Sequence, residues 1–113
     1  MGQRAKLLLS FSPNPVYRNH QSDTKWYFDV VVQEISGMGV TLQHLQAQWL
    51  TEQGQVHDQL EEAINIVIQP GEQALFPELW VSSALTRFRY RLVLTGRDEA
   101  GHPVQVEGEL ACW

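Results

Sequence analysis

The 113-residue sequence has a single cysteine and few basic residues, and both shortages narrow its possible functions. With Cys112 alone, neither an intrachain disulfide nor a metal site of several cysteines can form. Because its neighbours are apolar, we expect Cys112 to be a small strand residue and not a nucleophile. The 8 Lys and Arg are outnumbered by 13 Asp and Glu, which leaves a net charge of −5. Nucleic-acid binding depends on neutralising phosphates, so no nucleic-acid partner is predicted.

Long apolar runs and catalytic signatures are also missing. No stretch approaches the roughly 20 apolar residues of a membrane helix, so direct membrane insertion is not expected. The triple leucine that follows Arg4 and Lys6 is too short for the core of a signal peptide, which makes the cytoplasm the default location. The sequence has no G-x-S-x-G, H-E-x-x-H or glycine-rich phosphate loop. Its four histidines lack the spacing of metal ligands. We therefore predict a protein that is not an enzyme and binds no cofactor or metal.

The composition otherwise belongs to an ordinary globular protein. Hydrophobic residues make up 43% and charged residues 19%, and eleven aromatic residues offer large core anchors. A chain of this length fits one domain, which we assign to residues 1–113. Alternation with period two dominates the chain, so we expect an all-β fold of about seven or eight antiparallel strands.

Three strands are predicted in the first half of the chain, at Lys6–Phe11, Lys25–Ile35 and Val40–Thr51. Prolines in Ser12–Pro15 end the first strand, because proline cannot donate to a ladder. Val16–Tyr17 is expected to pair briefly along an edge, and residues 18–23 to form a polar loop. One face of the second strand carries Trp26, Phe28, Val30 and Val32.

The strand Val40–Thr51 changes parity midway. Its first apolar residues, Val40 and Leu42, share one phase, whereas the later ones share the other. A one-residue β-bulge near Gln43–His44 would return all of them to one side of the sheet. The later apolar residues are Leu45, Ala47 and Trp49.

The middle of the chain is harder to assign. Gln55–Ala63 is the weakest segment: a helical turn is conceivable there, but nine residues with so little apolar periodicity do not favour it. Ile64–Gln69 alternates as a strand, and Gln69–Glu72 fits a type II turn with its glycine in the left-handed position. We expect Gln73–Phe76 to pair back or to cross to a second sheet, and Pro77–Ala84 to be a packed connection.

A hairpin of Arg87–Thr95 and Pro103–Trp113 ends the chain, joined by residues 97–102. Even positions of both strands are mostly apolar, whereas odd positions carry three arginines and two glutamates. The aromatic and basic residues of the first strand therefore belong to opposite faces.

The turn allows two registers for these charged rows. One pairs Arg91 with Glu109. The other pairs Arg91 with Glu107 and Arg89 with Glu109. In either case the basic row meets an acidic row at cross-strand distance, and Arg87 is the arginine without an expected carboxylate opposite it. We therefore favour a solvated sheet face over a phosphate-binding platform, although the row could still contact a protein.

Trp80 and Trp113 are the tryptophans that we expect to be partly exposed. Trp80 follows a turn that contains proline, and Trp113 ends the chain on the polar phase. An exposed tryptophan can anchor a protein partner or stack on a sugar. We favour the simpler interpretation, in which both cap open ends of the core.

Several segments resemble immunoglobulin-like modules of bacterial proteins. The resemblance covers nearly the whole chain and implies an immunoglobulin-like Greek-key β-sandwich. Such modules act as spacers, adhesion modules or subunit contacts, often in exported proteins, so a cell-envelope or extracellular location stays open. The resemblance transfers no functional residues. Its segments are Phe11–Val16 (FSPNPV), Lys25–Glu34 (KWYFDVVVQE), Ser36–Leu42 (SGMGVTL) and Arg91–Val104 (RLVLTGRDEAGHPV), the last paired with the final strand.

The sequence thus predicts a non-enzymatic protein-interaction or structural module. It would be an accessory subunit of a larger assembly or a self-associating domain. The alternative is a carbohydrate-binding module that uses exposed tryptophans. The candidate contact residues are Arg87, Arg89, Arg91, Trp80 and Trp113.

Overall fold

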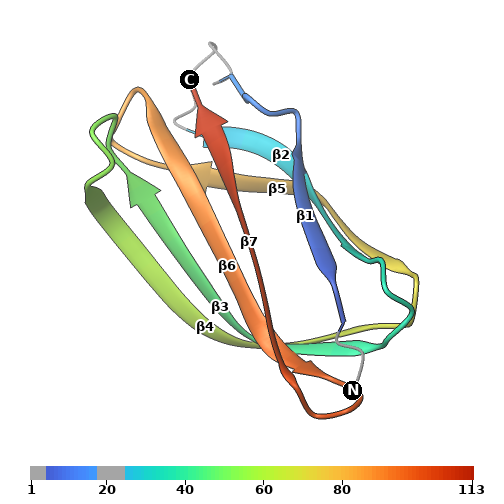
Figure 1. Ribbon diagram of the computed structural model, residues 1–113. Coiled ribbons are helices and arrows are strands. Elements are labelled where there is room, and N and C mark those ends of the chain that lie inside the picture. The colour runs from blue at the N-terminus through green and yellow to red at the C-terminus, as the bar shows by residue number, and fades with distance from the viewer. Residues whose placement is uncertain (1–4, 18–24) are drawn as a thin grey trace.

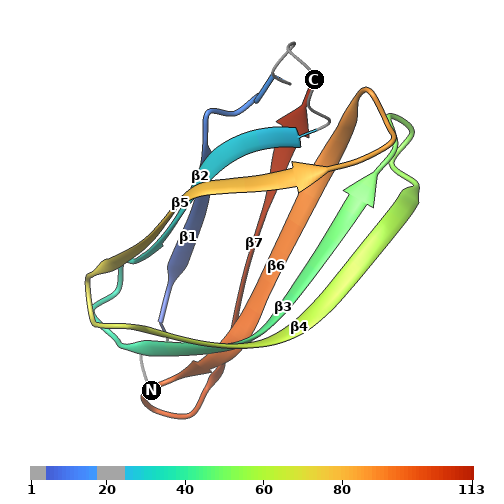
Figure 2. The same cartoon turned by 180° about the vertical axis from the view of Figure 1, so that it is seen from behind.

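The structure is a computed structural model that describes residues 5–17 and 25–113. Seven strands form two antiparallel sheets, and the described residues contain no helix. Figures 1 and 2 show the two sheets from opposite sides. The predicted all-β class is confirmed, while the predicted loop at residues 18–23 lies outside the described residues. One sheet has the order β1 (Leu7–Ser12), β2 (Lys25–Glu34), β5 (Gln73–Ser82); the other has the order β4 (Val56–Ile68), β3 (Val40–Leu50), β6 (Phe88–Asp98), β7 (Pro103–Cys112).

The core lies between the sheets and is built from alternate residues of each strand. The predicted apolar face of β2 is buried, and Trp26 at its start is fully enclosed. Its indole ring packs edge-on against Phe88 of β6, with ring centroids 4.8 Å apart. Burial of each large apolar side chain contributes roughly 1.5–3 kcal/mol, so these alternating faces hold the sheets together.

The predicted bulge in β3 is confirmed. The register of β3 shifts between Leu42 and His44 against both of its neighbours, β4 and β6. Gly96 of β6 lies opposite Leu42 at this point. A Cβ atom on Gly96 would overlap the carbonyl oxygen of Thr41 and lie 2.7 Å from the Cα of Leu42, so only glycine fits between these backbones.

The middle of the chain differs from the sequence-based expectations at two segments. No helical turn occurs within Gln55–Ala63; β4 runs unbroken from Val56 to Ile68, because pairing with β3 supplies the order that local periodicity lacks. Pro77–Ala84 is not a packed connection, since β5 continues through it to Ser82. Gln73–Phe76 was expected either to pair back or to cross to a second sheet. The structure shows the crossing, because these residues begin β5, which pairs with β2.

A bulge explains how proline is accommodated in β5. In the β2–β5 register, Phe28 pairs with Leu79 and Val30 pairs with Phe76. Pro77 and Glu78 of β5 therefore both lie opposite Asp29 of β2. The backbone of Glu78 has a φ of 56°. β5 is an edge strand, so one of its sides has no neighbouring strand. On that side there is no hydrogen-bond ladder for a proline, which lacks an N–H, to interrupt.

One long side of the sandwich is closed and the other presents two strand edges. On the closed side, the side chains of Leu9 and Phe11 of β1 lie so close to Gly108 of β7 that a Cβ atom there would be 3.1 Å from each. Val16 then bridges to the end of β7, as predicted, by accepting from the N–H of Trp113 and donating to the carbonyl of Ala111. On the other side, β4 and β5 are the edges of their sheets.

Candidate interaction surfaces

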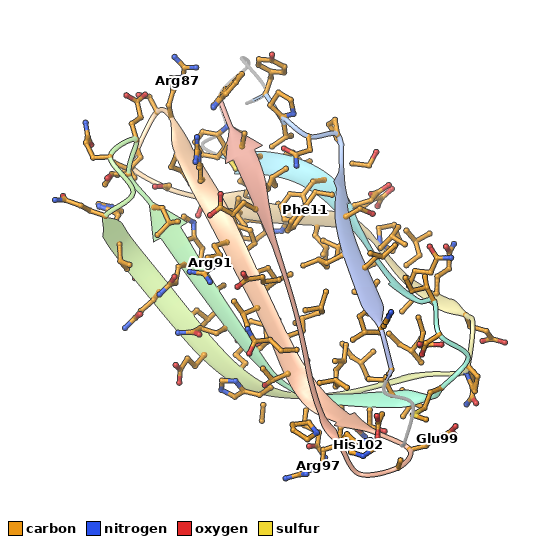
Figure 3. The ribbon with its side chains drawn as sticks, viewed as in Figure 1. Phe11, Arg87, Arg91, Arg97, Glu99 and His102 are labelled. Carbon is orange, nitrogen blue, oxygen red and sulfur yellow. The ribbon has the colours of Figure 1, made fainter. Side chains whose placement is uncertain are left out.

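The predicted division of the last hairpin into two faces is confirmed. Phe88 and Tyr90 are buried, whereas Arg87 and Arg89 are exposed and Arg91 is half-buried. Figure 3 shows Arg87 at one end of β6, Arg97 at the other and Arg91 between them. The arginines and the aromatic rings therefore do not share a surface on this strand.

The charged rows combine features of both predicted registers. The backbone has the first register, with Arg91 directly opposite Glu109. The ion pairs nevertheless run diagonally, from Arg91 to Glu107 at 2.5 Å and from Arg89 to Glu109 at 3.8 Å. Long side chains reach diagonal neighbours easily across twisted strands.

These pairs differ in strength, because only Arg91 donates a hydrogen bond to its carboxylate, whereas Arg89 approaches Glu109 at 3.8 Å. The hydrogen bond to Glu107 and the charge of that carboxylate raise the pKa of Arg91. Exposed ion pairs of this kind contribute little stability because water and salt screen them. Of the three candidate arginines, only Arg91 is hydrogen-bonded to a carboxylate within the sheet.

Arg87 has different surroundings. The last strand offers it no carboxylate, as expected, but Glu52 in the turn after β3 approaches its Nε to 3.8 Å. Its guanidinium lies over the ring of Trp113, 4.8 Å from the centroid, and Tyr17 meets the same ring edge-on. We call Tyr17, Glu52, Arg87 and Trp113 the Arg87–Trp113 patch.

The Arg87–Trp113 patch borders two shallow hollows at one end of the sandwich. One, of about 210 Å³, is lined by Glu52, Arg87, Phe88, Arg89 and Trp113. The other, of about 300 Å³, is lined by Thr51, Glu52, Gln53, Leu85, Thr86 and Arg87. Trp113 itself is 43% exposed, in agreement with the prediction that it is partly accessible.

Trp80 lies on the outer face of the other sheet. It is directly opposite Tyr27 in the β2–β5 register, and the two side chains are 52% and 43% exposed. The ammonium of Lys25 lies 4.4 Å from the centroid of the Trp80 ring. Because Trp113 packs beneath Arg87 beside the four-stranded sheet, the two candidate tryptophans belong to different surfaces.

Two buried carboxylates are part of the framework and not of a reactive site. Glu34 is fully buried, and its oxygens accept hydrogen bonds from the Ser36 hydroxyl and five backbone N–H groups. Burial alone would raise the pKa of Glu34, but these hydrogen bonds outweigh it and hold the pKa well below its usual range. Asp98, also buried, similarly accepts from the N–H groups of Ala5, Ala100 and His102.

The remaining chemically reactive groups are dispersed. Cys112 is buried, and burial raises the pKa of its thiol to about 12. His44 lies near Glu61, and His102 contacts Asp98, while His20 lies outside the described residues. Within residues 5–17 and 25–113, no cluster of three potential metal ligands occurs. The same residues include no helix long and apolar enough to cross a membrane.

Several residues of these surfaces were not anticipated from the sequence. Tyr17 joins the Arg87–Trp113 patch from the segment just after the bridge at Val16, and Glu52 joins it from the turn after β3; no local pattern marks either residue. Tyr27 could have been found, because it occupies the outward phase of β2. The two framework carboxylates, Glu34 and Asp98, could also have been found, since each occupies the buried phase at the end of its strand.

Comparisons with known proteins show solved structures of similar fold but give no evidence for a function. The sequence matches no protein-family model, and no curated protein resembles it significantly. The crystal structure of a Bordetella pertussis protein provisionally named ApaA superposes with a TM-score of 0.75 at 16% identity, covering 97% of this chain and 96% of that one. The X-ray structure of a Northeast Structural Genomics Consortium target gives a TM-score of 0.57 at 11% identity, covering 96% and 85%. At such identities the likeness shows the fold alone.

Proposed function

We propose that this chain is a non-enzymatic protein-interaction module with an immunoglobulin-like Greek-key sandwich, and that it contacts its partner through the Arg87–Trp113 patch. The observation that carries the proposal is an exposed arginine that lies over the ring of an exposed tryptophan at one end of the sandwich. Arginine, tryptophan and tyrosine are the residues most enriched at interaction hot spots. The strand order, in which β5 crosses back to pair with β2, supports the immunoglobulin-like assignment.

The donors of Arg87 support a role in binding. Its one carboxylate contact, at 3.8 Å, is too long for a hydrogen bond. Among the described residues, no acceptor takes a hydrogen bond from its guanidinium. A guanidinium held over an aromatic ring, with unused donors, is prepared to pair with a carboxylate or backbone carbonyl of a partner.

The free strand edges are less suited to self-association. The edge of β5 is interrupted by Pro77 and by the bulge at Glu78. The first half of β4 carries exposed Asp58, Glu61 and Glu62, which would face one another in many pairings of two copies. Bulges, prolines and charges are established means of blunting an edge. A contact through side chains at the Arg87–Trp113 patch is therefore favoured over strand addition.

The test compares Arg87→Glu and Trp113→Ala with Arg97→Glu, a matched charge reversal at the far end of β6. Sedimentation of the wild type at high concentration measures self-association, and a native pull-down recovers any other partner. We expect both patch variants to weaken the complex about tenfold or more, because each removes a hot-spot side chain, and Arg97→Glu to leave it intact. A strictly monomeric wild type with no recovered partner would contradict the proposal.

A second candidate function is carbohydrate binding, as a module that uses exposed aromatic rings. The cross-strand pair of Tyr27 and Trp80 favours it, since two exposed rings on one sheet face can form a stacking platform. Trp113 does not belong to that platform, because its ring packs between Arg87 and Tyr17. A glycan array with Trp80→Ala and Trp113→Ala separates this function from the first, since only Trp80→Ala should alter a glycan signal.

A further inference from the structure

The outer face of the three-stranded sheet combines aromatic and acidic side chains beside a hollow. A hollow of about 450 Å³ is lined by Ser12, Pro13, Tyr27, Phe28, Asp29 and Glu78. Its volume falls within the range of small-molecule sites, about 300–1,000 Å³. Trp80 flanks it, because Trp80 lies directly opposite Tyr27 on the same face of the sheet.

The β5 bulge creates the acidic wall of this hollow. Pro77 and Glu78 are the two residues opposite Asp29, and the N–H of Glu78 donates to Asp29 Oδ1 at 2.9 Å. This bond uses one oxygen of Asp29, while the Glu78 carboxylate accepts no hydrogen bond from the described residues. Two carboxylates therefore line the hollow, and the wall offers more acceptors than donors.

The charge of the hollow decides which ligand fits. Neither lysine nor arginine is among the residues that line it, so phosphates and other anions would be repelled. The ammonium of Lys25 lies over the Trp80 ring, 4.4 Å from its centroid, so a sugar that stacks on this face must displace that ammonium. A sugar ring presents C–H groups that suit aromatic faces and hydroxyl groups that donate to carboxylates.

We propose that this face binds a neutral saccharide. Its C–H groups pack on Tyr27 and Trp80, and its hydroxyl groups donate to Asp29 and Glu78. The inference rests on the second candidate function and locates its site on one sheet. It is independent of the protein contact at the Arg87–Trp113 patch, which lies elsewhere on the molecule.

The probes are neutral hexasaccharides of β-1,4-glucan, β-1,4-mannan, α-1,4-glucan and chitin, tested by calorimetry with the full chain. We expect at least one to bind, and Trp80→Ala and Tyr27→Ala each to weaken its binding about tenfold or more, because each removes a stacking face. The control Trp113→Ala should bind as the wild type does. No binding of any probe at millimolar concentration, or equal losses in Trp80→Ala and Trp113→Ala, would overturn the proposal.

A second pair of variants tests the acidic wall without disturbing the strand. Glu78→Gly removes the carboxylate while glycine accepts the positive φ, so the fold should be at least as stable as before. Asp29→Asn keeps an oxygen acceptor for the Glu78 N–H. Both should weaken hexasaccharide binding, and unchanged affinity in both would overturn the role of the wall.

An anionic probe and an independent assembly assay complete the test. A sulfated hexasaccharide should bind less tightly than its neutral counterpart, and tighter binding would overturn the proposed neutral ligand. Arg87→Glu should bind sugar normally, and Trp80→Ala should assemble normally. Failure of sugar binding is thereby distinguished from failure of the protein contact.

Discussion

The carboxylate of Glu34 accepts a hydrogen bond from the backbone N–H of Gly71, 37 positions along the chain, at 3.1 Å. The same carboxylate binds the turn after β2, through the N–H groups of Gly37 and Met38, and the start of β1, through the N–H of Lys6. It therefore ties three chain segments together at one end of the sandwich. Because charge-assisted hydrogen bonds are stronger than neutral ones, this buried anion is a framework element.

Glu34→Gln should destabilise the fold strongly. The amide nitrogen of glutamine would face N–H donors that now reach a carboxylate oxygen, which leaves buried polar groups unsatisfied. We expect the free energy of unfolding to fall by about 3 kcal/mol, measured by urea denaturation. The matched control is Glu61→Gln, whose side chain is 61% exposed, and it should change stability by less than about 0.5 kcal/mol. Equal effects of the two substitutions would contradict the role assigned to Glu34.

Stability should fall as the pH is lowered through the acid range. The pKa of Glu34 in the folded chain lies below its ordinary value of 4.5, so the unfolded chain takes up protons first. The stabilisation is therefore complete above about pH 4.5 and is lost as the pH falls toward the folded pKa. The lowered pKa of Asp98 acts in the same direction. Urea midpoints measured at several pH values should fall less steeply with decreasing pH in Glu34→Gln than in the wild type. Parallel curves for the two proteins would show that Glu34 does not cause the acid loss of stability.

Gly96→Ala should be far more damaging than Gly108→Ala. A Cβ on Gly96 would meet the backbone of Thr41 and Leu42, which the bulge holds in place, whereas one on Gly108 would meet only side chains of Leu9 and Phe11, at 3.1 Å. We expect losses of about 3 kcal/mol and about 1 kcal/mol, respectively, in thermal or urea unfolding. The reverse order would show that the backbones do not approach closely at Gly96.

Cys112 should resist alkylation while the protein is folded. Its side chain is buried, and the raised pKa of about 12 leaves almost no thiolate at pH 8. Iodoacetamide should modify it only when the chain unfolds, as followed by mass spectrometry. Thr86→Cys supplies an exposed thiol in the same chain as a control, and it should react at the rate of a free cysteine. Comparable rates at both positions would contradict the burial of Cys112.

The sequence predicted those parts of the fold in which one strand face is apolar. Alternation located β2, β6 and β7 to within a few residues, and the parity change in β3 revealed its bulge. The same approach failed for β4. Leu60 there lies in the inward phase yet is 41% exposed, because the opposing sheet has only three strands and leaves the inner face of β4 largely open. Without a buried face, a strand has no apolar period to detect.

The candidate surfaces were predictable only in part. The outward phase of Arg87, Arg89 and Arg91 followed from parity, but the diagonal choice of Glu107 for Arg91 depends on side-chain reach across a twisted sheet. The continuation of β5 through Pro77 was missed, since proline usually ends a strand unless a bulge on an edge accommodates it. The hollow between Asp29 and Glu78 arises from that bulge and was therefore missed as well.

The sequence by itself determined the all-β class, the inward and outward residues of most strands, and the absence of cysteine pairs. It could do so because the two-residue period of a strand is a local property of the chain. Only the tertiary structure decided that β5 crosses to β2, that Glu34 binds Gly71, and that Arg87 stacks on Trp113. These contacts join residues far apart in the sequence, and they depend on how the two sheets pair and pack, which no local period encodes.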